Sequence, residues 1–164
     1  MLDISKRFID ISETTRPGDK IDKIFKTILY HAPLKNEGAI KNRNYINNLK
    51  NQDDIFCSYH YIIDFNGKII NIIPEDEISL HTNILNVDMH SISICICYNN
   101  STKISTASIT SLRKLALYLT KKYSLVPSSD LIRCYDIINK RSPIFFVDTP
   151  YYFMDFKDDL KNRE

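Results

Sequence analysis

The chain has 164 residues, a formal net charge of +2, 43% apolar residues and 26% charged residues. This length predicts a single domain over residues 1–164 with its own buried core. The near balance of charge excludes a polybasic nucleic-acid module, so we expect no nucleic-acid partner. Three glycines and no tryptophan accompany ten tyrosines, and this glycine content lies well below the usual ~7%.

No segment of the sequence predicts membrane insertion or secretion. Apolar runs fall far short of the ~18 residues that span a bilayer, and the longest, such as Ile144–Val147, have the length of a core strand. The charged N-terminus lacks the apolar stretch of a secretion signal. We therefore expect no membrane span, a cytoplasmic location as synthesised, and free thiols at the four cysteines. Cys95 and Cys97 are expected to act as small buried apolar residues.

The first elements follow from turn signals and apolar patterning. Residues 1–22, which contain the turn signal Thr15–Gly18, are expected to form an N-terminal extension that packs on the domain. Ile24–Tyr30 predicts a buried strand that ends at His31, because Ala32-Pro33 follows it. Gly38–Asn51 predicts a helix. Its expected apolar side consists of Ala39, Tyr45, Ile46 and Leu49.

The remaining elements combine one hairpin, one alternating strand and two helices. In Tyr59–Pro74, two β-rich runs flank Asn66-Gly67, which favours a hairpin with a type I′ turn. Ser91–Tyr98 alternates isoleucine with serine or cysteine, as a strand does. Helical spacing over Ser108–Tyr123, and a shorter pattern over Tyr152–Lys161, predict helices. These elements indicate an α/β (α+β) fold with a mixed central β-sheet flanked by helices.

Side chains that could perform chemistry gather at a strand end and in a late polar segment. His31 ends a predicted strand, which is where sites are often built in α/β sheets, although a lone histidine there is more often structural. Tyr59 and His60 open the hairpin and should point to opposite faces. Arg133–Pro143 reads as a loop that holds a thiol, a carboxylate, a lysine and a hydroxyl, and a solvated polar loop is the simpler interpretation.

Several ordered segments of the sequence resemble the type-2 N-acetylmuramoyl-L-alanine amidases. The likeness is greatest to the catalytic domains of clostridial and phage endolysins, and it runs over nearly the whole chain. SYHYIIDFNGKIINIIPEDEISLH resembles the family's hairpin and histidine segment, HSISICICYN resembles its N-S-I-G-I strand, and DLIRCYDIINKRSP resembles its R-H-Y-D-x-x-G-K-x-C-P loop.

This resemblance implies a specific reaction and a zinc site. The family cleaves the amide bond between muramic acid and L-alanine in peptidoglycan, with a zinc ion on three protein ligands and a water in the open position. By resemblance, the metal positions are His31, Cys134 where the family has histidine, and Ser142 where it has cysteine or aspartate. Tyr59 matches a catalytic tyrosine of one branch, and Lys140 matches the lysine that stabilises the oxyanion.

Further positions of the substrate cleft are also carried over by resemblance. They are His60, His81, Asn83, Ser93 and Cys95. His81 matches the histidine of a W-H-x-G segment, whereas Asn83 and Ser93 replace family glycines and Cys95 replaces a glutamate. Asn139 likewise stands at the glycine before the lysine, and Ala32 and Leu80 stand at tryptophan positions. The missing glycines and tryptophans therefore map to the cleft.

The substitutions at the metal positions predict a weak or absent zinc ion. A neutral serine hydroxyl is a poor ligand beside a thiolate or carboxylate, and three or four ligands are needed. In the related animal peptidoglycan-recognition proteins, serine at this position accompanies lost hydrolysis and retained muropeptide binding. We therefore expect a pseudoenzyme that binds peptidoglycan or muropeptide, or that serves a protein partner such as a holin or an exported protein.

Two alternatives stay open at this point. One is an active amidase with an atypical ligand set of His31 and Cys134. The other is an endolysin remnant that assists holin-type release of another protein. Under all of these hypotheses, the chain would reach the cell wall only by a holin-like or lytic route.

Overall fold

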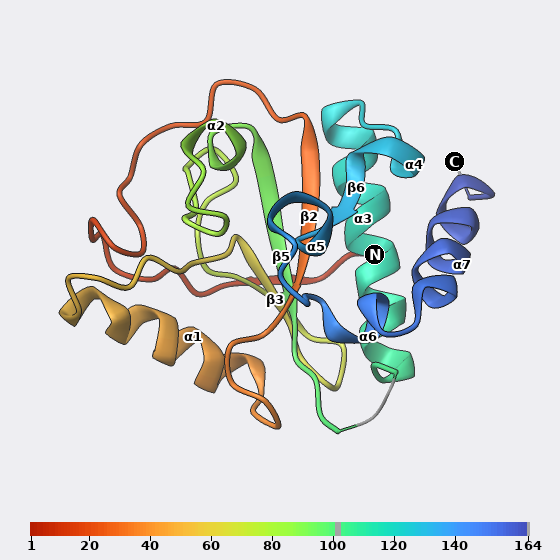
Figure 1. The fold of residues 1–164 in the computed structure, drawn as a ribbon, viewed down its shortest axis with the longest axis horizontal. Helices are drawn as coiled ribbons and strands as arrows, with labels where there is room; N and C mark the ends of the chain where they lie inside the picture. The colour runs from red at the N-terminus through yellow and green to blue at the C-terminus, as the bar shows by residue number, and fades with distance from the viewer. Residues whose placement is uncertain (101–102, 164) are drawn as a thin grey trace.

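The computed structural model describes residues 1–100 and 103–163, which form a six-stranded mixed sheet with helices on both faces (Figure 1). The strand order is β1-β4-β3-β5-β2-β6. The predicted fold class is therefore confirmed. The strands are β1 (Ile4–Lys6), β2 (Lys26–His31), β3 (Tyr61–Ile63), β4 (Ile69–Asn71), β5 (Ser91–Ile96) and β6 (Leu131–Arg133).

Parallel pairing around β2 places the ends of distant segments together. His31 at the end of β2 pairs with Ile96 of β5, and Leu29 pairs with Arg133, the last residue of β6. The backbone N–H of Cys134 then donates to the carbonyl of Leu29 at 3.0 Å. The late polar segment is thereby fixed beside the end of the first predicted strand, although about a hundred residues separate them.

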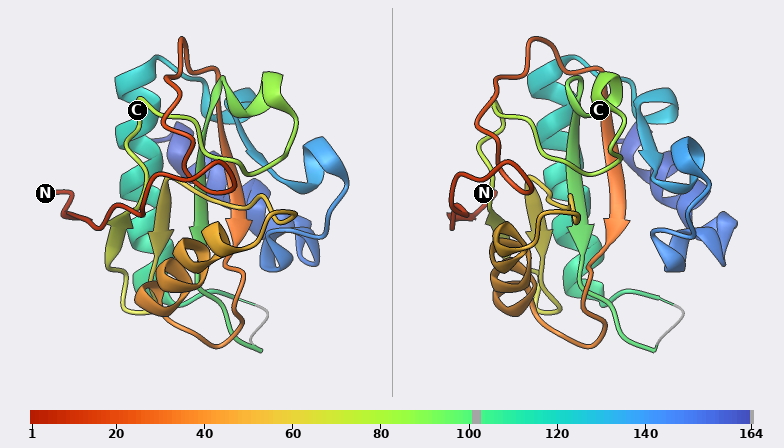
Figure 2. Two further views of the ribbon diagram at one scale, coloured as in Figure 1. Left: turned by 90° about the vertical axis from the view of Figure 1, so that its left-hand side faces the viewer. Right: turned by 60° about the vertical axis from the view of Figure 1, so that its left-hand side comes forward.

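The helices cover the two faces of the sheet unequally (Figure 2). The longer ones are α1 (Ala39–Asn48), α3 (Thr106–Tyr123) and α7 (Pro150–Lys161); the one-turn helices are α2 (Leu85–Asp88), α4 (Pro127–Asp130), α5 (Tyr135–Ile138) and α6 (Ile144–Val147), with a 3-10 turn over Leu49–Asn51. One apolar core joins the sheet to α3 and α7, and a second joins the opposite face to α1. Among the described residues, no helix is long and apolar enough to cross a membrane.

The predicted helix at Gly38 forms, but its buried side differs at one position. Ala39, Ile46 and Leu49 are buried as expected, whereas Tyr45 is 38% exposed. Asn42 is buried instead. Its amide nitrogen donates to the carbonyls of Glu37 and Gly38, so a polar side chain satisfies the loop that enters the helix. The prediction for Tyr45 is wrong because apolar spacing cannot reveal this role of Asn42.

The hairpin lies where it was predicted, but its turn has a different geometry. Strands β3 and β4 pair antiparallel around a three-residue loop that Asp64 and Lys68 close, with the N–H of Asp64 donating to the Lys68 carbonyl. Gly67 has a φ of +82°, whereas Asn66 does not have a positive φ. A type I′ turn needs positive φ at both central residues. The Asn66 side chain instead accepts the Lys68 N–H at 2.9 Å.

Other short elements differ from their predicted form. Ile144–Val147 has the length of a core strand but forms the helical turn α6, with Phe145 and Phe146 buried in the core that contains α7. The segment expected as a loop from Arg133 begins as the last residue of β6 and continues into α5. Within residues 1–22, the strand β1 pairs parallel with β4 and forms one edge of the sheet.

Candidate functional site

His31 and Ser142 lie in direct contact at the end of β2. The backbone N–H of His31 donates to Ser142 Oγ at 3.1 Å, and the N–H of Ile144 donates to His31 Nδ1 at 3.0 Å. The imidazole also packs on the Tyr98 ring, with 4.6 Å between ring centroids. Burial, together with the positive charges of Lys140 and Arg141, lowers the pKa of His31 to about 4. His31 is therefore neutral near pH 7.

Cys134 lies next to this contact, on the sheet face that α1 covers. Its side chain is fully buried, and the hydroxyl of Tyr30 lies against the thiol. Tyr30 in turn packs on Tyr59, with ring centroids 4.9 Å apart, and the Cys57 thiol donates to the Tyr59 hydroxyl at 3.6 Å. Burial raises the pKa of both Cys57 and Cys134, which favours neutral thiols.

The side chain of Lys140, together with that of Arg141, brings positive charge to this region. It is exposed, yet its ammonium group acts electrostatically on His31, Cys57 and Cys134 alike. The structure thus gathers the predicted metal and catalytic positions in one place. We call the group of His31, Cys57, Tyr59, Cys134, Lys140 and Ser142 the candidate cleft.

A buried hydrogen-bonded chain that sequence reasoning missed lies behind the candidate cleft. The hydroxyl of Tyr30 donates to His81 Nδ1 at 2.6 Å, because His81 Nε2 carries the proton that it donates to Ser91 Oγ at 3.0 Å. The Ser91 hydroxyl donates a hydrogen bond to the Val87 carbonyl, so its oxygen accepts from His81 Nε2. His81 Nδ1 then carries no proton and accepts from Tyr30. Asp88 Oδ1 is 3.3 Å from His81 Nε2. The sequence signal for this chain was the hydroxyl-bearing Tyr30, which directly follows the apolar residues Ile28 and Leu29.

Most residues expected on the cleft surface are buried in the structure. His81 serves the chain just described, and burial lowers its pKa well below the usual value. His60 is fully buried between Ser93, Ser79 and the Glu77 carbonyl, which accepts from His60 Nε2 at 2.8 Å. Ser93 and Cys95 are also fully buried. Four of the five expected cleft residues are therefore part of the protein interior: His60, His81, Ser93 and Cys95. Asn83 is the one that is exposed.

Two asparagines have a left-handed backbone at positions where the family resemblance led us to expect glycine. Asn83 has a φ of +60° and Asn139 a φ of +54°. Asparagine tolerates this left-handed conformation better than most residues. Asn139 ends helix α5 and precedes Lys140. The turn before Lys140 therefore has a left-handed residue without glycine.

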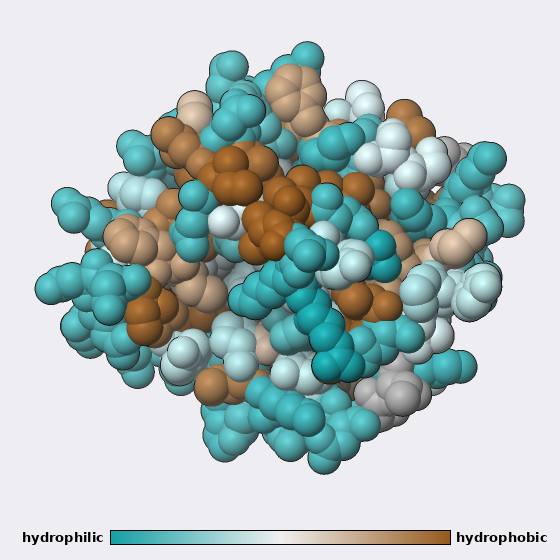
Figure 3. Space-filling model, viewed as in Figure 1, coloured by the Kyte–Doolittle hydropathy of each residue, from teal (hydrophilic) through white to brown (hydrophobic). Residues whose placement is uncertain are grey.

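The surroundings of the candidate cleft combine few metal donors with an apolar rim. Among the described residues, no group of three or more His, Cys, Asp or Glu side chains could hold a metal ion. Beside Cys57, an apolar surface is formed over the loop before β3 and around α2 (Figure 3). We call it the apolar rim; it consists of Ile55, Phe56, Ile84 and Leu85, all 39 to 66% exposed. The Asn83 amide links its two loops by donating to the Phe56 carbonyl.

The order and geometry of these segments match a known family over most of the chain. The family model of N-acetylmuramoyl-L-alanine amidase matches residues 23–143, from before β2 to just after Ser142. The chain belongs to the N-acetylmuramoyl-L-alanine amidase family. Among curated amidases, it is similar to BlyA of Bacillus subtilis strain 168, with 26% identity over 95% of this chain and 46% of BlyA. The chain spans less than half the length of the curated relatives it matches.

Solved structures confirm the amidase fold. The catalytic domain of XlyA superposes with a TM-score of 0.75 at 19% identity, covering 94% of this chain and 99% of that domain. The endolysin amidase LysCS from Clostridium intestinale URNW superposes with a TM-score of 0.67 at 22% identity, covering 87% of this chain and 88% of LysCS. The expected likeness to endolysin catalytic domains, clostridial ones included, is therefore confirmed for the fold.

Proposed function

We propose that this amidase-family chain binds muropeptide, a fragment of peptidoglycan, without cleaving it. The observation that carries the proposal is the donor set of the candidate cleft. Only His31 at the three family metal positions is an imidazole, Ser142 is a neutral hydroxyl and Cys134 is a buried thiol. A catalytic zinc site needs three protein ligands and an open position. The residues present do not fit that requirement.

The hydrogen bonds of His31 and Ser142 reinforce this argument. A neutral imidazole has one free lone pair, and in His31 the Nδ1 lone pair accepts the Ile144 N–H. Nε2 then carries the proton and cannot bind a metal. Ser142 Oγ is engaged by the His31 N–H. Binding of a cation would have to break these contacts without gaining a negatively charged ligand at Ser142.

Cys134 adds little to metal affinity in this setting. A thiolate binds zinc whereas a thiol does not, and burial raises the pKa of Cys134 above its usual value. The nearby Lys140 ammonium favours the thiolate, but burial is the larger effect. The alternative of an active site based on His31 and Cys134 therefore has two donors, an imidazole and a buried thiol, where three ligands are required.

Features other than the metal positions support retained binding. Lys140 and Tyr59 remain at the positions that the family resemblance assigns to catalysis, and the turn before Lys140 has the left-handed residue Asn139. The apolar rim next to Cys57 offers contact area for a ligand of mixed polarity. A muropeptide has both the polar sugar and the peptide that such a surface could contact.

Two assays on the same protein test this function. We expect muramyl tripeptide to bind in a calorimetric titration, whereas dye-labelled peptidoglycan releases no dye above a buffer control. Lys140→Ala should weaken binding several-fold, and Lys161→Ala, at an exposed lysine at the end of helix α7, should leave it unchanged. Dye release that requires added zinc and disappears in His31→Ala would contradict the proposal. Absence of both binding and release would contradict it as well.

A further inference from the structure

A groove on the opposite face of the sheet from the candidate cleft has the features of a second binding site. Two cavities, of about 410 and 510 Å³, lie one after the other along helix α3 and strand β1. From α3 they are lined by Ser111, Lys114, Tyr118 and Lys122. These residues are three to four positions apart and so share one face of the helix over about 17 Å. We call the two cavities together the α3 groove.

The groove lies on a different side of the sheet from the candidate cleft. Tyr61 of β3, which lines the larger cavity, belongs to the core that contains α3. Tyr30, Tyr59 and Cys134 of the candidate cleft region belong to the other core, which contains α1 residues. A ligand in the α3 groove would therefore not compete directly with a ligand in the candidate cleft.

Asn71 supplies a hydrogen-bond acceptor to this groove. The residue lines the larger cavity and is 5% exposed. Its amide nitrogen donates to the backbone carbonyls of His60 at 2.8 Å and Ile73 at 2.7 Å, which fixes the orientation of the amide. Within the described residues, Asn71 Oδ1 accepts no hydrogen bond. This oxygen is therefore free to accept a hydrogen bond from a ligand hydroxyl in the cavity.

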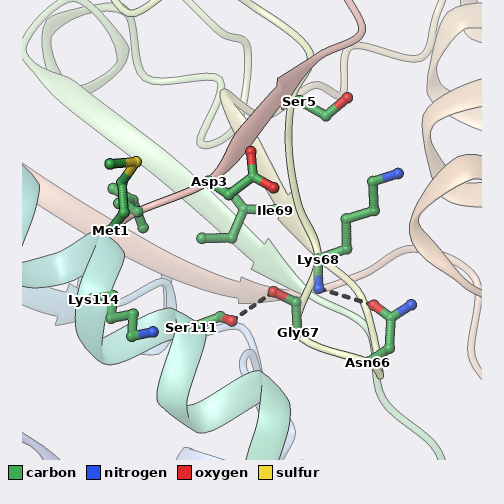
Figure 4. A pocket seen from close by; sticks show the side chains of 10 residues that line it. Met1, Asp3, Ser5, Asn66, Gly67, Lys68, Ile69, Ser111 and Lys114 are labelled. Carbon is green, nitrogen blue, oxygen red and sulfur yellow. Dashed lines mark hydrogen bonds between the residues drawn. The ribbon is translucent and has the colours of Figure 1, made fainter.

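The charges along the groove favour an anion. In the part of the chain that the structure describes, Lys6, Lys68 and Lys114 are exposed and form no salt bridge. Lys68 from the hairpin and Lys114 from α3 line the smaller cavity from different elements (Figure 4). Asp3 is the single acidic residue lining that cavity. The unpaired lysines therefore outnumber the unpaired carboxylates.

The acidic residues of the larger cavity are already neutralised. Glu75 accepts hydrogen bonds from Lys122 Nζ at 2.9 Å and from the hydroxyls of Tyr61 and Tyr123. Asp76 pairs with Lys20 at 2.7 Å. Beside them, the rings of Phe8 and Tyr118 line the same cavity and are each 37% exposed, with Arg16 over the Phe8 ring and Lys122 over the Tyr118 ring.

We propose that the α3 groove binds a polyhydroxylated anion, such as an acidic saccharide or a phosphate-bearing polyol. Hydroxyl groups would donate to Asn71 Oδ1, the negative charges would lie near Lys6, Lys68 and Lys114, and the carbon atoms would pack on the exposed part of Tyr118. This proposal does not rest on the function proposed for the candidate cleft, because no residue of that cleft takes part.

Titrations with three defined probes test the groove. We expect trigalacturonate, glycerol 3-phosphate or both to bind more tightly than maltotriose, which is neutral; the preferred anion tells carboxylate from phosphate chemistry. The double variant Lys68→Glu/Lys114→Glu should bind the preferred anion about tenfold more weakly. Tyr118→Ala should also weaken binding, without a change in charge. The double variant Lys35→Glu/Lys161→Glu, which alters the same charge at exposed positions outside the groove, is the matched control.

The outcomes separate cleanly. Binding that falls in both groove variants and persists in the control supports the proposal. If neither anion binds, if maltotriose binds as tightly as the anions, or if the control loses as much affinity as the groove variants, the proposal is wrong. Muramyl tripeptide binding, measured on the same variants, should be unchanged, so failure of this site is distinguishable from failure of the candidate cleft.

Discussion

At Cys134, the backbone has a structural role in the sheet, whereas the side chain determines which chemistry the position supports. Its N–H holds the carbonyl of Leu29 as part of the sheet, whatever its side chain is. The side chain, however, is a buried thiol at the position where the resemblance expects an imidazole. The Tyr30 hydroxyl lies against this thiol. Sequence reasoning located Cys134 but missed Tyr30, because its bond to His81 joins strands and loops far apart in the chain.

The Tyr30 hydroxyl is expected to contribute to stability through its bond to His81. In Tyr30→Phe, the buried Nδ1 of His81 loses its donor, which should lower the free energy of unfolding by about 1–3 kcal/mol. Urea denaturation at pH 7 measures the change. Tyr45→Phe removes the hydroxyl of a tyrosine that is 38% exposed and should alter stability very little. Equal effects of the two substitutions would show that the buried bond contributes nothing.

His60 predicts a dependence of stability on pH. Burial lowers its folded-state pKa to about 4, below the value of about 6.5 in the unfolded chain. Its contribution is therefore complete above pH 6.5 and is lost as the pH falls towards 4, by up to about 1.4 kcal/mol per pH unit. Urea midpoints between pH 7.5 and pH 4.5 should fall less steeply in His60→Gln than in the unmodified chain. Parallel slopes would show that His60 is not the responsible group.

At the scale of elements, local sequence signals predicted where the hairpin and the strands lie more reliably than they predicted the geometry of the turn. Asn66-Gly67 located the hairpin, and the alternation in Ser91–Tyr98 located β5, because both signals act through neighbouring residues. The type of turn depended on tertiary contacts that short patterns do not contain. Here Ser111 of α3 donates to the Gly67 carbonyl, so the turn is shaped by a helix more than forty residues away. The short strands β1 and β6 were missed because three residues carry too little pattern.

Gly67 should be far less tolerant of substitution than Gly38. Its φ is +82°, and a Cβ there would lie 2.8 Å from the Ala107 carbonyl oxygen. Gly67→Ala should therefore destabilise the protein by about 1–3 kcal/mol and lower the Tm by several degrees. Gly38→Ala, at a φ of −77° and with a flexible carboxylate as its nearest neighbour, should cost clearly less. Thermal unfolding of the two variants measures both changes in Tm. A larger loss of stability in Gly38→Ala than in Gly67→Ala would contradict the assigned turn.

At the scale of the whole molecule, the chain has the amidase fold, and the positions that the resemblance assigns to metal ligands hold an imidazole, a thiol and a hydroxyl. The mixed sheet, the long helices and the placement of His31 beside the late loop followed from patterning and from family resemblance. Burial of His60, Ser93 and Cys95 did not, because a motif gives a position in the chain and not its exposure. The compositional scarcity of glycine now has a local explanation, since Asn83 and Asn139 hold left-handed turns without it.

Rebuilding the metal positions should show whether the rest of the fold still supports a zinc site. The double variant Cys134→His/Ser142→Cys supplies an imidazole and a thiol in place of the buried thiol and the hydroxyl. We expect it to bind zinc stoichiometrically, and Ser142→Ala, which adds no ligand, to serve as the control. Failure of the double variant to bind zinc, with the fold intact by circular dichroism, would show that His31 does not occupy the expected ligand position.

Zinc content of the unmodified protein tests the central claim most directly. After incubation with excess zinc and removal of free metal by gel filtration, elemental analysis should find far less than one zinc ion per chain. The result follows from two weak donors at Cys134 and Ser142 and from the occupied Nδ1 of His31. One zinc ion per chain that is lost in His31→Ala would contradict the account.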